Sequence, residues 1–236
     1  MWGDRLEPGA VDRFAPQLPA KPGSVAAPVA VEQEPRFAAF FARERGDQLR
    51  RLIVSEFVTL DGVMEAPGGE EGHPHSGWVF DFMSQEQERY KLDEVMEAEA
   101  LLLGRVTYEG FAGAWPQRSG PFADKMNGMS KYVVSTTLEN PEWNNTTVMR
   151  DVKEVAGVKD EDGGPILVAG SRTLVQGLME HGLIDEFRLM IFPVVLGSGA
   201  RLFPETPEKT PLELADTRTF ESGVVVQSYN TAASPA

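Results

Sequence analysis

Residues 165–174 read Pro-Ile-Leu-Val-Ala-Gly-Ser-Arg-Thr-Leu, a short apolar run that passes into small and hydroxyl residues. An apolar run of this length that ends at a glycine is typical of a buried strand, and the Leu and Val spacing in residues 171–181 is typical of a helix. The segment therefore predicts one strand-turn-helix unit of an α/β sheet.

The same alternation extends over the sequence on both sides of this unit. Ser84 is a suitable N-cap for a helix whose apolar stripe includes Val95, and further helices are predicted at residues 104–115 and near residues 152–158. Further strands are predicted at residues 52–59, 100–103, 132–136, 146–149 and 185–195. Repeated strand-helix alternation favours a parallel sheet with crossover helices.

The last third of the sequence adds an antiparallel element. Pro193 interrupts the long apolar run 185–195, which predicts a bulge or a sheet edge there. Residues 212–220 and 224–229 are joined by a Glu-Ser-Gly turn and predict an antiparallel hairpin. The predicted fold class is α/β, with a mixed, mostly parallel sheet and this hairpin at its C-terminal end.

The first fifty residues differ from the rest, because prolines alternate there with Ala and Val and apolar periodicity is missing. This composition predicts an extension over residues 1–50, followed by one domain over residues 51–232. Phe37, Phe40 and Phe41 are at helical spacing, which is compatible with a short amphipathic helix in residues 36–50.

Charge and composition narrow the classes of function. The formal net charge of -14 over 236 residues disfavours sequence-independent binding to nucleic acid or to an anionic membrane. The absence of cysteine excludes disulfides, thiolate metal sites and thiol nucleophiles. No apolar run approaches the roughly 20 residues of a membrane-spanning helix, so we expect a cytoplasmic protein that acts on a small molecule.

Three strand-to-helix turns carry residues suited to phosphate. Gly104 and Arg105 follow a predicted strand, where backbone N–H groups and the helix dipole favour an anion and the guanidinium fits a phosphate. The other two turns contain Ser135 with Thr136, and Gly170 with Ser171. Each turn alone is also compatible with an ordinary cap, but three in one domain favour an extended phosphorylated ligand such as a dinucleotide. Neither G-x-G-x-x-G nor G-x-x-x-x-G-K-[ST] is present.

In this order, these segments resemble the dihydrofolate reductase-like superfamily, and especially the branch that contains the reductase domain of bacterial riboflavin biosynthesis. The resemblance covers about residues 51–230. It rests on Thr-Leu-Asp-Gly at 59–62, Gly-Arg-x-Thr-x-Glu at 104–109, Ser-Thr at 135–136, Ala-Gly-Ser at 169–171, and the stretch from Leu-Ile-Asp-Glu at 183–186 to Leu-Gly-Ser-Gly at 196–199.

The resemblance implies a three-layer αβα fold with about eight strands, and NADPH bound across the C-terminal strand ends. Arg105 and Thr107 would hold cofactor phosphates, Ser135 and Thr136 would lie along the adenosine, and the turn at 170–173 would embrace the pyrophosphate. The implied cofactor-binding residues are Gly104, Arg105, Thr107, Ser135, Thr136, Gly170, Ser171, Arg172, Thr173 and Leu174. The expected activity is hydride transfer from NADPH to a small unidentified substrate with a C=N or C=O bond.

Two departures separate the chain from riboflavin-pathway reductases. These relatives often carry a lysine where this chain has Val63, and a substrate-binding glutamate at the position that matches Ala169. Both differences count against a ribosylaminopyrimidine substrate. A 5-amino-6-(5-phosphoribosylamino)uracil reductase-type activity, a non-catalytic nucleotide-binding module, and a flavin or F420 cofactor in place of NADPH are the alternatives that the sequence leaves open.

Reduction of a C=N or C=O bond also needs a proton, and Asp61 and Asp81 are the candidate acids. Asp61 is equally suited to forming a turn beside Gly62. Trp78 and Phe82 are candidates for stacking on a planar substrate, with core packing as the alternative. His73 and His75 lack a matching third ligand, so no metal site is expected. The exposed hairpin and the long strand 185–195 favour a homodimer.

Overall fold

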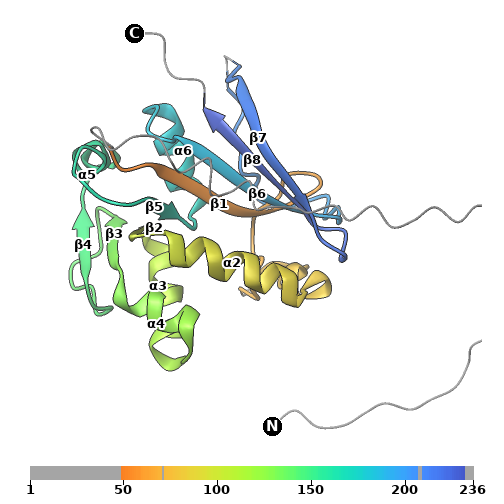
Figure 1. The fold of residues 1–236 in the computed structure, drawn as a ribbon, viewed down its shortest axis with the longest axis horizontal. Coiled ribbons are helices and arrows are strands. Elements are labelled where there is room, and N and C mark those ends of the chain that lie inside the picture. Colours follow the sequence, from red (N-terminus) through yellow and green to blue (C-terminus); the bar gives the residue numbers. More distant parts are fainter. Residues whose placement is uncertain (1–48, 71, 207–208, 232–236) are drawn as a thin grey trace, which may run out of the picture. The chain divides into compact units, whose positions relative to one another are not determined.

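The computed structural model describes residues 49–70, 72–206 and 209–231, and it contains an eight-stranded sheet (Figure 1). The strand order is β4-β3-β2-β5-β1-β6-β8-β7. The strands are β1 (Leu52–Thr59), β2 (Ala100–Gly104), β3 (Ser130–Val134), β4 (Thr146–Met149), β5 (Ile166–Val168), β6 (Glu186–Phe192), β7 (Leu212–Thr219) and β8 (Val225–Thr231). Every pair is parallel except those of β8, which runs antiparallel to β6 and β7. The predicted fold class is confirmed, including the C-terminal hairpin.

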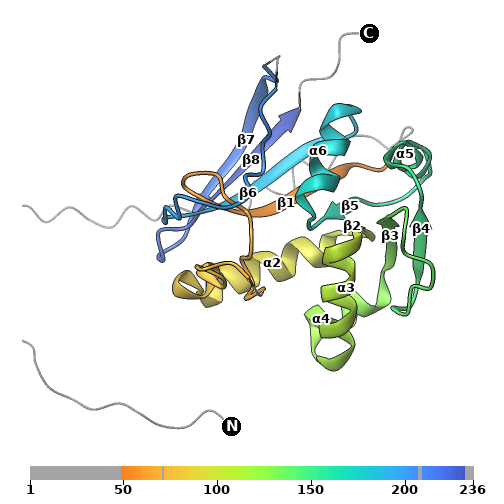
Figure 2. The same cartoon turned by 180° about the vertical axis from the view of Figure 1, so that it is seen from behind.

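Helices cover both faces of the sheet, which gives the three predicted layers (Figure 2). One apolar cluster joins the sheet to α2 (Gln85–Glu97), α3 (Arg105–Ala114) and α4 (Pro121–Gly128). Another joins the opposite face to α5 (Val155–Lys159) and α6 (Arg172–Glu180). Short 3-10 helices are η1 (Trp78–Phe82), η2 (Trp115–Gln117) and η3 (Val152–Glu154). We refer to the two sides as the α2 face and the α6 face.

The path of the chain creates a topological switch point at the end of β5. From β1 the chain crosses to β2 on one side, returns through β5, and continues to β6 on the other side of β1. The strand β5 pairs with β1 only as far as Val54, so the last five residues of β1 extend beyond it. Ligands of open α/β sheets bind at such points, outside the carboxyl ends of the strands.

Local predictions were mostly confirmed, with clear exceptions. The Ser84 hydroxyl caps α2 by accepting from the N–H of Gln87. Pro193 marks neither a bulge nor an edge, because β6 ends at Phe192 and lies between β1 and β8. The strand predicted at 132–136 spans Ser130–Val134, and the helix α4 was not predicted. The extension and its helix at 36–50 lie almost wholly outside the described residues and stay predictions.

Within the described residues, no helix is both long and apolar enough to cross a membrane.

Candidate functional site

Two of the three predicted turns meet at this switch point. The N–H of Gly104, at the end of β2, donates to the carbonyl oxygen of Gly170 at 3.3 Å, and the Gly170–Ser171 peptide bond is cis. A Cβ on Gly104 would lie 2.2 Å from Ser171 Oγ, and a Cβ on Gly170, whose φ is 80°, would lie 2.8 Å from Thr107 Oγ1. Only glycine allows the turns to approach so closely.

The helices that follow both turns start without side-chain caps. Gly104 precedes α3 and Ser171 precedes α6, and neither makes a side-chain cap hydrogen bond. Their first backbone N–H groups are therefore suited to bind an anion. Arg172 and Thr173 are exposed, whereas Leu174 is buried in the core, so Leu174 can reach a ligand through its backbone only.

Arg105 stands beside these turns on the protein surface. Its guanidinium donates to both carboxylate oxygens of Glu109 at 2.8 Å, one helical turn further along α3. Both side chains are nearly half exposed. An exposed pair of this kind contributes little to stability, so the guanidinium can exchange Glu109 for a phosphate at small cost.

The third turn is held by its own hydroxyl. Ser135 is buried, and its Oγ accepts from the N–H groups of Thr137 and Leu138 at 3.2 and 2.9 Å. Thr136 is exposed and leaves its hydroxyl at the surface. Arg150, which sequence reasoning missed, donates to the carbonyl oxygens of Ser135 and Leu138. Its place directly after β4, at the same sheet edge, was the available signal.

Asp61 fixes the loop after β1. Its carboxylate accepts from the Thr59 hydroxyl at 2.6 Å and from the N–H groups of Gly197 and Leu196 at 2.9 and 3.3 Å. The Thr59 hydrogen bond, together with the two backbone N–H groups, holds the pKa of Asp61 below its usual value. An ionised Asp61 suits a loop clamp, and its role as a proton donor stays a prediction.

A small cleft of about 340 Å³ lies between η1 and the segment after β6. It is lined by His75, Ser76, Gly77, Trp78, Asp81, Val194, Val195 and Leu196. Asp81 is exposed at this cleft, while the Asp61 carboxylate contacts the same segment through Leu196 and Gly197. The structure therefore gathers both predicted acids around residues 194–197.

The two predicted stacking residues are mainly core residues. Trp78 is buried, its Nε1–H donates to the carbonyl oxygen of Glu65, and its ring meets Phe192 edge-on at 5.2 Å. The ring of Phe82 lies 6.0 Å from Phe192, also edge-on. Of the two, only Trp78 also lines the cleft, so a stacking role has better geometric support there. Within the described ranges, no group of three or more His, Asp or Glu side chains is arranged to hold a metal ion.

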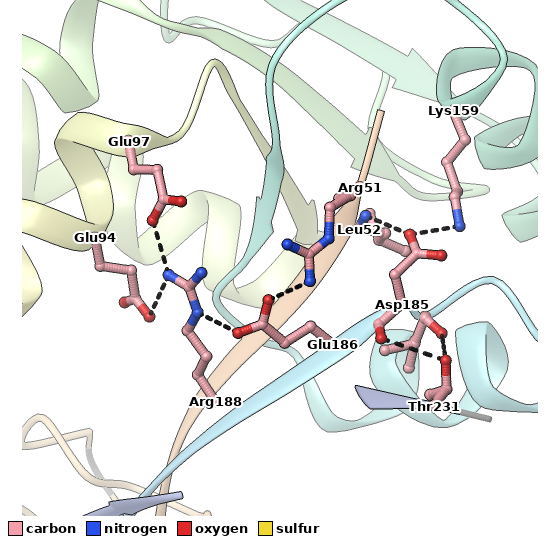
Figure 3. A network of polar contacts seen from close by, with 10 residues as sticks. Arg51, Leu52, Glu94, Glu97, Lys159, Asp185, Glu186, Arg188 and Thr231 are labelled. Carbon is pink, nitrogen blue, oxygen red and sulfur yellow. Dashed lines mark hydrogen bonds and ion pairs between the residues drawn. The ribbon is translucent and has the colours of Figure 1, made fainter. Parts of the chain in front are cut away.

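A network of charges fixes α2 against β1 and β6 (Figure 3). The buried Glu94 carboxylate pairs with Lys91 and accepts from the Ser55 hydroxyl at 2.9 Å. Arg188 of β6 contacts Glu94 at 3.8 Å and bonds to Glu97 at 3.0 Å and Glu186 at 2.7 Å. Each buried charge in this network has an opposite charge beside it.

Glu56 lies on the α6 face of β1, next to the switch point, and sequence reasoning missed it. It is 6% exposed, and its Oε1 accepts from the N–H of Gly170 at 2.6 Å. Burial raises the pKa of Glu56 to about 8, against the lowering effect of this hydrogen bond. The sequence did not indicate a role for Glu56, because its hydrogen-bond partner, Gly170, is 114 residues away in the chain.

A larger cleft of about 760 Å³ lies along α3, but it contains none of the predicted cofactor residues or acids. Two polar contacts of this cleft are internal, since the N–H of Trp143 donates to Tyr108 Oη and the Nε1–H of Trp143 donates to Asn127 Oδ1. We therefore take the switch point at the end of β5 as the candidate site.

Two curated relatives from Bacillus subtilis (strain 168) match most of the chain. The uncharacterized protein YyaP is 32% identical over 188 residues, which cover 77% of this chain and 95% of the relative. The uncharacterized protein YwjB is 30% identical over 177 residues, which cover 74% and 95%.

Solved structures share the fold at low identity. A candidate riboflavin biosynthesis protein from Shewanella sp. PV-4 has a TM-score of 0.59 at 18% identity, covering 78% of this chain and 99% of its own. A dihydrofolate reductase from Enterococcus faecalis, complexed with NADP(H) and RAB-propyl, has a TM-score of 0.53 at 17% identity, covering 78% and 97%. A pyrimidine reductase-like protein from Corynebacterium diphtheriae has a TM-score of 0.55 at 12% identity, covering 79% and 93%.

These neighbours, which include a dihydrofolate reductase, share the fold of this chain, as the sequence motifs predicted. The family described as RibD C-terminal domain matches residues 50–226, which is most of the sequence. The chain belongs to the RibD C-terminal domain family.

Proposed function

We propose that the protein is an NADPH-dependent reductase that transfers a hydride to a small substrate with a C=N or C=O bond. The observation that carries this proposal is the contact between the Gly104 and Gly170 turns, which brings two uncapped helix N-termini to the switch point. A dinucleotide has two linked phosphates that suit two adjacent anion sites. The bound NADP(H) of the Enterococcus faecalis neighbour supports the choice of cofactor.

The residues of the chain divide into binding and orienting roles. The backbone of 171–173 and the Thr107 hydroxyl hold the diphosphate, and Arg105 exchanges Glu109 for a phosphate. Thr136 contacts the adenosine side. When bound, NADPH supplies the hydride, and the protein fixes the distance and angle to the substrate.

The substrate enters the cleft beside Trp78 and Asp81. Asp81 is the better placed of the two acids to deliver a proton, because Asp61 already uses its carboxylate to hold residues 196 and 197. Val63 is fully buried, so the position that carries a lysine in many riboflavin-pathway reductases cannot present a charge to a ligand here. This favours a different small substrate.

A pair of glycine variants, one directly before α3 and one within it, tests the cofactor site. Gly104→Ala places a Cβ against Ser171 Oγ, whereas Gly110→Ala, six residues further on, meets no atom within 4 Å. Calorimetric titration of wild type with NADPH is expected to give a Kd in the micromolar range or tighter, and Gly104→Ala to weaken it at least about ten-fold. Gly110→Ala retains wild-type affinity. Failure of the wild type to bind NADPH contradicts the proposal.

A second pair tests the phosphate contact. Arg105→Ala is expected to weaken NADPH roughly ten-fold, since a charge-assisted contact is lost. The matched control is Arg118→Ala, because Arg118 is also a surface cation but stacks on Trp115. Equal effects of the two variants contradict the role of Arg105.

Turnover is tested separately from binding. Stopped-flow absorbance follows oxidation of bound NADPH with a panel of carbonyl, pterin, quinone and flavin acceptors. Oxidation by at least one acceptor is expected. A protein that binds NADPH but oxidises it with none of them is a nucleotide-binding module.

A further inference from the structure

Glu56 lies on β1 where the sheet is open on one side. On one side of β1, Glu56 is paired with Leu189 of β6. On the other side, β5 has already ended opposite Val54. The side of β1 left open by β5 is where the chain forms the Gly170 turn. The Glu56 carboxyl reaches across this gap to the N–H of Gly170.

The surroundings of Glu56 on its own face are apolar. Val54, Val58 and Leu189 belong to the buried cluster of the α6 face. The charges that act on Glu56 come from α2 on the opposite face, where Lys91 lowers and Glu94 raises its pKa, and these two effects oppose each other. Burial dominates, so the carboxyl is neutral at pH 7 and ionises near pH 8.

We propose that Glu56 is a positioning residue of the nucleotide site: as a neutral carboxyl it holds the Gly170 turn for an anionic cofactor, and its ionisation weakens binding of that cofactor. This inference rests on the proposed NADPH site. The neutral carboxyl accepts the Gly170 N–H without placing a charge behind the turn. The ionised carboxylate puts a negative charge at the N–H of Gly170, next in the chain to the backbone of 171–173 that holds the diphosphate, and like charges repel strongly where water is excluded.

The sign of the pH dependence follows from this arrangement. Below about pH 8 Glu56 is protonated and affinity is highest; above it the carboxylate forms and affinity falls. Wild-type Kd for NADPH is expected to rise about ten-fold between roughly pH 7 and pH 10. Glu56→Gln keeps a neutral acceptor at every pH, so its Kd is expected to stay flat over the same range.

Calorimetric or fluorescence titrations with NADPH across this range test the proposal. Glu213→Gln serves as the matched control, since Glu213 is an exposed carboxylate on the edge strand β7, and this variant is expected to keep the wild-type rise. A flat wild-type profile, or a rise in Glu56→Gln equal to that of wild type, overturns the proposal.

A measurement without cofactor separates this inference from the proposed function. The ¹⁵N–¹H NMR signal of the Gly170 amide is expected to titrate with a midpoint near pH 8 in wild type and not in Glu56→Gln. If the protein shows this titration but does not bind NADPH, the contact between Glu56 and Gly170 is supported and the proposed NADPH site is contradicted. A Gly170 signal that does not titrate in wild type overturns the role of Glu56, and this result does not depend on whether the variant folds.

Discussion

Two buried glutamates on opposite faces of the sheet have opposite environments. Glu94, on the α2 face, pairs with Lys91 and accepts from Ser55. It also faces Arg188 (Figure 3). Glu56, on the α6 face, has one backbone N–H and apolar neighbours. Burial alone does not decide the charge of a carboxyl; its partners do. The α2 face is therefore a fixed ionic framework, and the α6 face holds a titratable group under the proposed cofactor turn.

The largest expected effect is on the pH dependence of stability at Glu56. Its pKa is about 8 in the folded protein and 4.5 without burial, so the folded state retains a proton that the unfolded state releases. The stabilising contribution is complete below about pH 4.5 and is lost as pH rises to about 8. Relative to wild type, Glu56→Gln is expected to gain on the order of 4 kcal/mol between these limits. Urea unfolding at several pH values measures this, and parallel profiles would show that the carboxyl is ionised throughout.

The next largest effect on stability is expected when the ionic framework around Glu94 is broken. Glu94→Ala leaves Lys91 without its carboxylate in a largely buried place, and the free energy of unfolding is expected to fall by about 3 kcal/mol. Glu88→Gln, an exposed position on the same helix, is expected to change it by less than about 0.5 kcal/mol. Urea unfolding at one pH compares the two variants. Similar values for both would show that the buried Glu94 carboxylate contributes no more to stability than an exposed one.

A smaller effect is expected from the hydroxyl within the framework. Ser55 donates to Glu94 and accepts from Lys91 at 2.8 Å, so Ser55→Ala removes one hydrogen bond from each. A loss of roughly 1 to 2 kcal/mol is expected by urea unfolding. An unchanged midpoint would indicate that Lys91 and Glu94 compensate for each other.

The smallest effect is expected for an ion pair that is exposed to solvent. Arg218 and Glu86 form an ion pair at 3.2 Å between side chains that are 40% and 45% exposed. A double-mutant cycle with Arg218→Gln and Glu86→Gln is expected to give a coupling of at most about 0.5 kcal/mol that decreases with salt. A coupling as large as that of Glu94 would show that exposure does not separate these pairs.

Sequence patterns located most elements because they depend on near neighbours in the chain. The strand at 52–59, the Ser84 cap and the hairpin turn were all found in this way. The helix α4 was missed because its sequence, Pro-Phe-Ala-Asp-Lys-Met-Asn-Gly, has little apolar periodicity and begins with proline and ends with glycine. Pro193 was misread because a proline ends a central strand as readily as it marks an edge.

By itself, the sequence determined the α/β class, the glycine turns and the family, since these follow from local spacing and short motifs. Only the tertiary structure decided which polar residues act together. Glu56 and Gly170 are 114 residues apart, and Lys131 is buried against carbonyl oxygens of Asn127, Met129 and Asn144. The charge of a buried group depends on burial and on partners brought in by the fold, and neither is encoded in its own neighbourhood.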